Sequence, residues 1–450
     1  MAWFLLDVNF TRLRATSLYT LYCVVLMLLL VKILAIVLSL YSMSFLFYGG
    51  TTFTVHAQTD LQTTKHRGMV IDLGNGLKTN ARLNLPANGD GPFPGVLLIH
   101  GAGPNDMNET LGYVHINNKT GSIEYPPSRP FYQIAEYLTE RGFAVLQYDK
   151  RGVGANFTLL DSNVWRNATF DDLKQDAEKA LDVLIQQPEV DANHVTLVGH
   201  SEGTMIAPRV AIDNPGKVDN IVLMGSVAQN MRPLLYFQVV IKPILYAQQV
   251  LDHNHNGMIS LQEASENPLF TTMVGNLTLP LTQNVTTANG TTVEQLNTQY
   301  NTNNDTFISI NELKPRLIDN LNLLSNLTQS KECFGICPIW VTSHYALTPT
   351  LGIIGKVSSD VSILIQQGKN DSQTPMQQAF LLQQELTEVR HPDHTLITYP
   401  DLGHAFYPSS PWLTVKGQME QKVLEDLFGW LSDPVRGFTK VTILSSSQMR

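Results

Sequence analysis

Cysteine is scarce in this chain, with three among 450 residues. Cys23 falls in an apolar N-terminal segment, so the pair that could form a local disulfide is Cys333 and Cys337, in the run Cys-Phe-Gly-Ile-Cys. Two free thiols are the alternative. A disulfide that closes so short a loop gains little from loop entropy, so its contribution to stability would be small.

Charged residues are also few, at 15% of the chain. Lysine and arginine total 30 against 39 aspartates and glutamates, the net charge is −9, and the basic residues do not cluster. Because nucleic-acid binding relies on basic patches, this composition argues against a nucleic-acid partner. Hydrophobic residues make up 43%, which is enough to bury a sizeable core.

The N-terminus does not read as part of a globular fold. Residues 17–47 are almost wholly apolar apart from Lys32, and Arg12 and Arg14 precede them. We interpret residues 1–57 as a signal peptide or signal anchor that exports the rest of the chain. A small-residue cleavage site ends at Ala57, whereas an uncleaved 17–47 segment could span a bilayer of about 30 Å. The protein would be secreted in the first case and attached to the membrane in the second.

Asn-x-Ser/Thr sequences are dense after this leader, which favours an extracytoplasmic glycoprotein. They begin at Asn108, Asn118, Asn156, Asn167, Asn276, Asn284, Asn289, Asn304 and Asn326. Asn370 begins another, but it adjoins a candidate catalytic acid and is expected to be unmodified.

Strand-like and helix-like segments alternate from residue 66 onward, as in a mostly parallel sheet covered by helices on both faces. The expected strands are 68–72, 78–85, 95–99, 143–148, 194–198, 218–224, 361–366 and 394–399, and the expected helices are 130–141, 170–187, 202–213, 375–390 and 415–431. The alternation breaks at 229–350, a stretch rich in Asn, Thr, Gln and Leu for which we expect helical structure. We therefore predict one α/β domain in two parts, 58–228 and 351–435, with 229–350 inserted and 436–450 as a tail.

A candidate nucleophile lies between an expected strand and an expected helix. The run Gly-His-Ser-Glu-Gly at 199–203 has the Gly-x-Ser-x-Gly pattern of a nucleophile elbow, in which a tight turn presents the serine at a helix N-terminus. We predict that Ser201 is this nucleophile.

A serine hydroxyl needs a base, and the base needs an orienting acid. Asp371 follows the expected strand 361–366, and His404 follows the expected strand 394–399, so both fall at the carboxyl edge of the sheet in the order Ser, Asp, His. We predict that His404 is the general base and that Asp371 orients it. The rivals His391, His394, Asp360 and Asp393 precede their strands and fall at the wrong edge, while His100 and His200 are expected to be structural.

An oxyanion intermediate needs two hydrogen-bond donors. One should be the backbone N–H of Glu202, directly after the nucleophile. The other should come from the His-Gly-Ala-Gly-Pro run at 100–104, with Ala102 as the first choice and Gly101 as the alternative. The nearby triplet Asp-Lys-Arg at 149–151 could bind a substrate carboxylate, but a structural turn held by ion pairing of Arg151 is the favoured interpretation.

Three motifs together resemble a known family. They are Leu-Ile-His-Gly-Ala-Gly-Pro-Asn-Asp at 98–106, Tyr-Asp-Lys-Arg-Gly-Val-Gly at 148–154 and Val-Gly-His-Ser-Glu-Gly at 198–203. The set resembles bacterial and archaeal α/β-hydrolases of the serine aminopeptidase-like, carboxylesterase type, over residues 66–228 and 355–432. The resemblance implies the α/β-hydrolase fold, the triad Ser201, Asp371 and His404, and hydrolysis of carboxylic esters with short or medium acyl chains. Thr204 departs from it, since relatives commonly carry glycine there, and so does the insertion.

The insertion contains a run that fits an EF-hand calcium loop, at 252–263. Oxygen-bearing side chains occupy loop positions one, three, five and nine, glycine at six permits the sharp turn, and glutamate at twelve can chelate with both oxygens. The expected ligands are Asp252, Asn254, Asn256, the carbonyl of Met258, Ser260 and Glu263. His253 and His255 would point outward in such a loop, so a transition-metal site fits less well.

A second, weaker loop follows at 301–312, with Asn301 in place of the usual Asp and Thr306 in place of the usual Gly. Its expected ligands are Asn301, Asn303, Asp305, the carbonyl of Phe307, Ser309 and Glu312. Ile259 and Ile308 occupy the same loop position, where paired EF-hands join through a short β contact. With two carboxylates in each loop, we expect a modest affinity suited to extracellular calcium.

These features together predict an exported or membrane-anchored serine hydrolase that cleaves small-molecule carboxylic esters. The insertion is expected to form a lid that calcium orders, with the apolar run 234–251 facing the acyl pocket. A serine peptidase or amidase with the same triad and a non-catalytic calcium-dependent surface binding protein are the alternatives.

Overall fold

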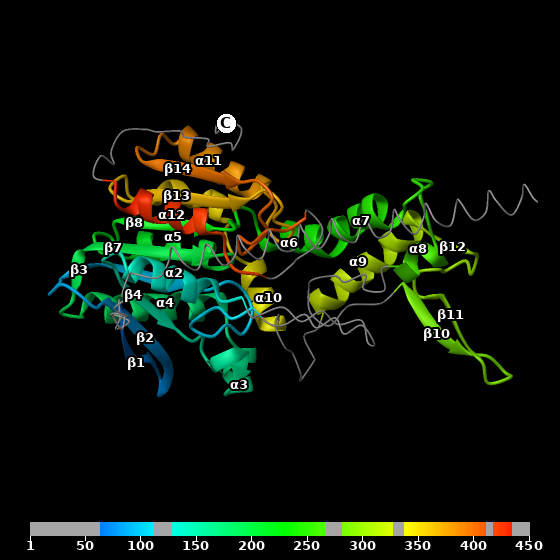
Figure 1. Cartoon of the computed structure of the whole chain (residues 1–450), viewed down its shortest axis with the longest axis horizontal. Coiled ribbons are helices and arrows are strands. Elements are labelled where there is room, and N and C mark those ends of the chain that lie inside the picture. Colours follow the sequence, from blue (N-terminus) through cyan, green and yellow to red (C-terminus); the bar gives the residue numbers. More distant parts are fainter. Residues whose placement is uncertain (1–63, 112–127, 267–280, 327–336, 411–416, 434–450) are drawn as a thin grey trace, which may run out of the picture. The chain divides into compact units, whose positions relative to one another are not determined.

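A computed structural model of the chain describes residues 64–111, 128–266, 281–326, 337–410 and 417–433 (Figure 1). The chain divides into two compact units, 1–61 and 62–450, and every described residue belongs to the second. The leader expected at 1–57 and the tail expected at 436–450 lie outside the described residues, as do the sequons at Asn118 and Asn276.

An eight-stranded sheet forms the centre of the second unit, in the order β1-β2-β4-β3-β7-β8-β13-β14. The strands are β1 (Thr64–Gly74), β2 (Leu77–Pro86), β3 (Phe93–Ile99), β4 (Ala144–Tyr148), β7 (Val190–His200), β8 (Asn220–Met224), β13 (Ser362–Gly368) and β14 (His394–Tyr399). The β1–β2 and β2–β4 pairs are antiparallel, and every other pair in the sheet is parallel. This arrangement confirms the predicted mostly parallel sheet, although β7 begins at Val190 rather than at residue 194.

Both faces of the sheet are covered, because successive strand residues point to opposite sides. In β3, Leu97 and Ile99 join one buried hydrophobic cluster, whereas Val96 and Leu98 join the other. The helices of the hydrolase part are α2 (Pro130–Thr139), α3 (Ser162–Arg166), α4 (Phe170–Ile185), α5 (Gly203–Asp213), α11 (Gln377–Glu388) and α12 (Gln421–Leu431). Side chains of α4, α5 and α11 belong to the first cluster, and those of α2 and α12 belong to the second.

Local sequence sets where these helices begin. At α4, the Thr169 side chain accepts from the Asp172 N–H while the Asp172 carboxylate accepts from the Thr169 N–H, which is a capping box. The start expected at residue 415 for the last helix is wrong for its described part, because Glu420 has an extended backbone and α12 begins only at Gln421.

A long helical run opens the insertion, made of α6 (Met231–Tyr236), the π-helical η2 (Phe237–Ile241), α7 (Lys242–Tyr246) and the π-helical η3 (Ala247–Leu251). Among the described residues, this run of 21 is long and apolar enough to cross a membrane by length and composition. Its buried side chains, which include Leu234, Val240 and Leu251, join the hydrophobic core. Packing therefore accounts for part of its apolar character, since 44% of the run's most apolar stretch is buried.

The rest of the insertion mixes short strands and helices. The elements are β9 (Met258–Ser260), α8 (Leu261–Glu266), β10 (Thr282–Thr286), β11 (Thr292–Leu296), β12 (Phe307–Ser309), α9 (Ile310–Asn326) and α10 (Pro338–Tyr345). The antiparallel hairpin β10–β11 contradicts the helical structure expected for this stretch. Its strands are rich in Thr and Val, and Asn289-Gly290 in the turn, with Gly290 at φ +82°, is a typical hairpin sequence.

Candidate active site

Ser201 lies in a strained turn between β7 and α5. Its φ of 54° falls in the left-handed region, which is uncommon for a residue with a side chain. A Cβ on Gly199 would lie 2.3 Å from the carbonyl oxygen of Gly203, and a Cβ on Gly203 would lie 2.1 Å from that of Ile99. Both flanking positions therefore require glycine, and the turn has the form that the Gly-x-Ser-x-Gly pattern predicts.

Asp371 and His404 follow neighbouring strands, β13 and β14, and they meet. His404 Nδ1 lies 2.8 Å from Asp371 Oδ2. Asp371 also accepts from the N–H groups of Gln373 and Thr374, the Thr374 hydroxyl and the Gln367 amide. Burial alone would raise the pKa of Asp371, but attraction to His404 and these hydrogen bonds outweigh it, so the pKa lies below its ordinary value. The carboxylate is held ionised and fixed in position.

Several contacts bring the His404 segment to the elbow. The Ser201 N–H donates to the Met224 carbonyl at 2.9 Å, and the next residue, Gly225, has φ +64°. A Cβ on Gly225 would lie 3.1 Å from the His404 ring. The His200 ring lies 4.7 Å from the His404 ring between centroids, with its Nε2 3.1 Å from the His404 carbonyl oxygen. Ser201 is half-buried, whereas Asp371 and His404 are buried, so the serine is the more accessible member of the three.

The rival histidines and aspartates have structural partners. His391 Nε2 lies 3.2 Å from the Ser358 carbonyl oxygen, His394 Nδ1 lies 2.9 Å from the His391 carbonyl oxygen, and Asp393 accepts from the Ser362 hydroxyl at 2.6 Å. Each of these groups lies at the amino edge of β13 and β14, opposite to His404.

His100 and His200 are buried, as expected of structural residues. His100 lies between the rings of Phe131 and Tyr148, and burial lowers its pKa to about 4, so it is neutral at pH 7. His200 Nδ1 lies 3.0 Å from Glu109 Oε2. Burial alone would lower the pKa of His200, but the Glu109 carboxylate outweighs burial and raises it.

The geometry of the 100–104 loop distinguishes the two oxyanion candidates. The Gly101 N–H donates to Glu109 Oε1 at 2.6 Å, so Gly101 is already engaged. Within the described residues, the N–H groups of Ala102 and Glu202 donate to no protein group. The loop also adjoins the elbow, since a Cβ on Gly101 would lie 3.0 Å from Ser201 Cβ. This favours Ala102 over Gly101 as the second donor.

The turn after β4 is held by ion pairs within the protein, as the structural interpretation expects. Arg151 pairs with Asp172 at 2.6 Å and with Asp176 at 2.7 Å, as ion pairing of this loop requires. Lys150 instead points inward and is 3% exposed. Its Nζ lies 2.6 Å from Glu202 Oε2, and sequence reasoning did not predict this buried pair.

Helix α10 of the insertion contacts the same carboxylate. Trp340 Nε1 donates to Glu202 Oε1, and His344 Nε2 lies 2.9 Å from that oxygen. Burial alone would raise the pKa of Glu202, but the Lys150 ammonium and His344 lower it to about 2. Cys337 precedes α10 and is disulfide-bonded, which excludes a free thiol there; Cys333 lies outside the described residues.

Comparison with known proteins identifies the family to which this fold belongs. The family model described as the alpha/beta hydrolase fold matches residues 95–411. The chain belongs to the alpha/beta hydrolase fold family.

One curated relative is Esterase EstD of Thermotoga maritima, which is 31% identical over 166 residues. The match covers 37% of this chain and 34% of EstD, so the chain spans about a third of the length of that relative.

Solved structures of similar fold include α/β hydrolase GrgF from Penicillium sp. sh18, with 15% identity, a TM-score of 0.42 and coverage of 76% of this chain and 91% of GrgF. Est1E from Butyrivibrio proteoclasticus has 14% identity, a TM-score of 0.38 and coverage of 81% and 95%. An acylaminoacyl peptidase from Pyrococcus horikoshii has 11% identity, a TM-score of 0.47 and coverage of 87% and 45%.

Thr204 has a structural role in this alpha/beta hydrolase. Its hydroxyl donates to the Ser201 carbonyl at 2.6 Å and accepts from the Val227 N–H at 2.9 Å. A glycine at this position would leave both backbone groups without this partner. Thr204 therefore ties the elbow to the segment that follows β8.

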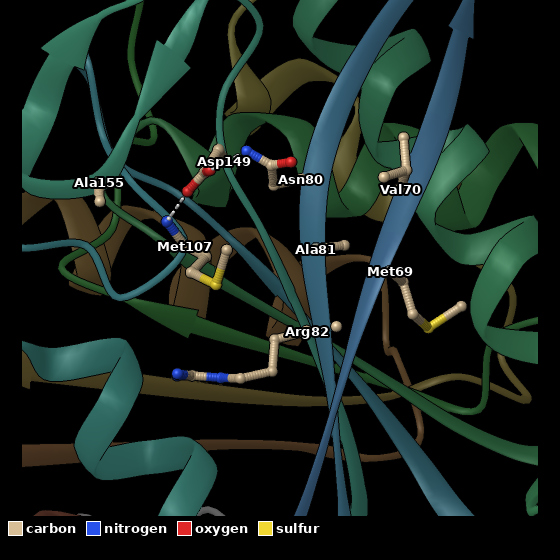
Figure 2. Close-up of a pocket in the computed structure, with 9 residues that line it drawn as sticks. Met69, Val70, Asn80, Ala81, Arg82, Met107, Asp149 and Ala155 are labelled. Carbon is tan, nitrogen blue, oxygen red and sulfur yellow. Dashed lines mark hydrogen bonds between the residues drawn. The ribbon is translucent and has the colours of Figure 1, made fainter.

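A cavity of about 500 Å³ lies beside the antiparallel edge of the hydrolase sheet (Figure 2). Residues of β1 and β2 line it together with Met107, Asp149 and Ala155. The Asp149 carboxylate accepts from the Met107 N–H at 2.7 Å, so it is engaged within the protein. Ser201, Asp371 and His404 do not line this cavity, which is therefore separate from the candidate catalytic residues.

The first predicted calcium loop, 252–263, is folded around its own oxygen atoms. Asp252 accepts from the N–H groups of Asn256 and Gly257 at 3.0 and 2.8 Å, and Glu263 accepts from the N–H and hydroxyl of Ser260 at 2.9 and 2.8 Å. Gly257, at loop position six, has φ +81°. Burial alone would raise the pKa of Glu263, but the Ser260 hydrogen bonds lower it, so the carboxylate is ionised.

The second loop, 301–312, repeats this pattern. Glu312 accepts from the N–H and hydroxyl of Ser309, each at 2.9 Å, and from the Thr302 N–H at 3.1 Å. Asn301 is 4% exposed, and its Oδ1 has no hydrogen-bond partner among the residues that the structure describes. A buried oxygen without a donor at loop position one is suited to a cation.

The two loops pair as their matched positions predict. Ile308 lies opposite Ile259 in the antiparallel β9–β12 pair. His253 and His255 are exposed, in agreement with the outward orientation expected. No group of three or more His, Cys, Asp or Glu suited to a metal occurs among the described residues. The side chains and carbonyls at the expected ligand positions of the two loops offer carboxylate, amide, hydroxyl and carbonyl oxygens. These are the ligands that calcium prefers.

Two successive hydrogen bonds connect the insertion to the candidate catalytic acid through Gln373. Gln238, in the helical run that ends at the first loop, donates to the Gln373 carbonyl at 2.8 Å. The Gln373 N–H donates in turn to Asp371 Oδ1 at 2.8 Å. The helix that enters the first loop therefore also supports the loop that holds Asp371.

Proposed function

We propose that this alpha/beta hydrolase is an exported serine esterase that cleaves small-molecule carboxylic esters, with a calcium-binding insertion as its lid. The 2.8 Å contact between His404 Nδ1 and Asp371 Oδ2, beside the strained elbow of Ser201, is the observation that carries the proposal. The esterase relative supports the ester as substrate.

In the proposed reaction, His404 Nε2 takes the hydroxyl proton of Ser201 as Oγ attacks the ester carbonyl carbon. Asp371 keeps His404 in the required tautomer and stabilises the imidazolium. The N–H groups of Ala102 and Glu202 donate to the oxyanion. Collapse of the intermediate transfers the proton to the departing alcohol, and water then repeats the sequence to release the acid and free Ser201. Ser201 Oγ has no hydrogen bond within the described part of the chain, and such contacts commonly tighten only when substrate binds.

Calcium would be held by the two loops, each with two carboxylates and further neutral oxygens. The donor chemistry, the β9–β12 pairing and the buried Asn301 Oδ1 support this part of the proposal. When bound, calcium would supply charge neutralisation that fixes the ends of the helices around each loop. The Gln238–Gln373 hydrogen bond is the route by which that order would reach the catalytic acid.

Export is supported by surface chemistry. The sequons at Asn156, Asn167, Asn284, Asn289 and Asn304 are exposed. Cys337 is disulfide-bonded, and disulfides persist mainly in oxidising compartments.

The decisive experiment is a substrate panel with residues 58–450. Wild type should hydrolyse p-nitrophenyl acyl esters faster than aminoacyl p-nitroanilides and should react with a fluorophosphonate. Ser201→Ala should abolish hydrolysis and labelling, whereas the exposed control Ser162→Ala should change neither. Faster hydrolysis of the aminoacyl p-nitroanilides than of the esters would indicate a peptidase instead of an esterase. Hydrolysis retained in Ser201→Ala would refute the mechanism.

The calcium lid is tested separately with EGTA. Chelation should lower both the ester-hydrolysis rate and the melting temperature, and added calcium should restore them. If neither quantity responds, the lid does not bind calcium in a functional way.

A further inference from the structure

Lys150 links the two backbone segments that supply the proposed oxyanion donors. Its Nζ donates to the Gly101 carbonyl oxygen at 2.5 Å and to Glu202 Oε2 at 2.6 Å. Gly101 directly precedes Ala102, and Glu202 carries the other donor on its own backbone. One buried ammonium group is therefore hydrogen-bonded to both sides of the proposed oxyanion hole.

The contact with Gly101 acts on the same peptide group that carries the Ala102 N–H. In a trans peptide the C=O and N–H point in opposite directions, and the cis bond found in the described residues is elsewhere, at Gly91–Pro92. Holding the Gly101 oxygen therefore sets the direction of the Ala102 N–H. Donation from a cation to the carbonyl also polarises the peptide, which makes its N–H a stronger donor.

Two further contacts hold Gly101, one on this peptide group and one on the peptide group before it. Asn105 Nδ2 donates to the Gly101 oxygen at 2.7 Å, and Glu109 accepts from the Gly101 N–H at 2.6 Å. Lys150 differs from Asn105 in being charged and in reaching the elbow as well. Glu202, which is 1% exposed, neutralises that charge.

We propose that Lys150 is a positioning residue of the oxyanion hole, which aims and polarises the Ala102 N–H and locks its loop to the elbow through Glu202. The proposal rests on the proposed serine esterase function. It assigns to Lys150 an effect on the transition state rather than on substrate binding, because the oxyanion forms only after attack.

The test compares the double variant Lys150→Met/Glu202→Gln with the single variant Glu202→Gln. Lys150→Met alone is not used, because it would leave a buried carboxylate without its cation. Removing the ammonium in this background should lower kcat about 10- to 100-fold, less than or comparable to loss of a whole oxyanion donor. KM should change less than about threefold, because interactions that are equally strong in the ground state and the transition state are unchanged. The affinity for a trifluoromethyl ketone transition-state analogue should fall by the same factor as kcat/KM. Lys217→Met, which removes a surface lysine paired with Asp182, is the matched control and should leave kcat within about twofold.

Asn105→Leu provides a second measurement that removes no buried charge. It deletes the neutral hydrogen bond to the same oxygen and should lower kcat and analogue affinity together by a smaller factor than the loss of Lys150. A kcat and an analogue affinity within twofold of the Glu202→Gln parent would overturn the role of Lys150. The role of Lys150 would also be overturned if the double variant lost affinity for the product acid by the same factor as for the analogue, because that loss would indicate general disruption of the site. A wild-type protein that neither hydrolyses esters nor reacts with fluorophosphonate would instead overturn the proposed function, and this inference with it.

Discussion

His404 depends on Asp371 for its orientation and for the charge that it carries during the proposed reaction. Asp371 receives hydrogen bonds on both oxygens, so its carboxylate has little freedom to rotate. An amide in its place would retain the shape and lose the negative charge. The contribution of the acid can therefore be measured with little change in packing.

Asp371→Asn should lower kcat by about 10⁴-fold with a small change in KM, because the wrong histidine tautomer would be stabilised. Steady-state kinetics on p-nitrophenyl esters measure this effect. Asp360→Asn, at the exposed opposite end of β13, is the control and should have wild-type kinetics. Strong activity in Asp371→Asn would require a different acid.

Glu202 should impose a pH dependence on stability. Its pKa is about 2 in the folded protein against an ordinary value of 4.5, so its stabilising effect is full above pH 4.5 and disappears as the pH falls toward 2. Glu202→Gln should lower the free energy of unfolding by about 3 kcal/mol at pH 6 through loss of the buried pair. Urea unfolding at pH 6 and pH 3 should show this difference shrinking at the lower pH.

The exposed control Glu388→Gln should show no such trend. An equal difference for Glu202→Gln at both pH values would mean that Lys150 and His344 do not hold its carboxylate ionised.

The candidate triad could be predicted from the sequence because its members follow strands in a fixed chain order. Ser201, Asp371 and His404 each follow a recognisable buried strand within a few residues, and parallel strands bring their carboxyl ends to one edge. No comparable sequence pattern predicts the buried ion pairs of Lys150 and Glu109. Their partners, Glu202 and His200, lie far along the chain, and only the folded loops bring these charges together.

At the scale of elements, the insertion combines two loops, a hairpin and a long helical run. The loops and their β9–β12 contact could be predicted because ligand positions recur at fixed spacing. The β10–β11 hairpin was missed because an Asn- and Thr-rich composition was interpreted as helical, although Asn289-Gly290 was a local signal for a turn. Composition over a long window is a weaker guide than the turn residues within it.

Calcium binding should stabilise the insertion through Glu263, the twelfth residue of the first loop. At calcium about 100-fold above Kd, linkage adds about 2.7 kcal/mol, which should raise Tm by about 3 °C for a unit of this size. Glu263→Gln should reduce this shift, as measured by scanning calorimetry with calcium or EGTA. Glu266→Gln, an exposed change on the same helix, should retain it. An undiminished shift in Glu263→Gln would place any calcium elsewhere.

At the scale of the whole molecule, the proposed export predicts glycans at accessible sequons. Asn156, Asn167, Asn284 and Asn289 are exposed, whereas Asn370 is half-buried and its amide donates to the Ser409 carbonyl at 2.6 Å. Glycopeptide mass spectrometry of protein expressed through a glycosylating secretory route should find glycans among the first four and none at Asn370. Unmodified asparagines throughout would contradict export by such a route.

The buried Lys150–Glu202 pair also bears on product release. An ester is neutral, but the acid that hydrolysis yields is an anion at pH 7. A bare ammonium beside the oxyanion hole would retain that anion and slow each turnover, whereas the Glu202 carboxylate, 2.6 Å away, cancels its charge. With this pair, the proposed esterase would hold a cation beside its oxyanion hole and still let its acidic product diffuse away.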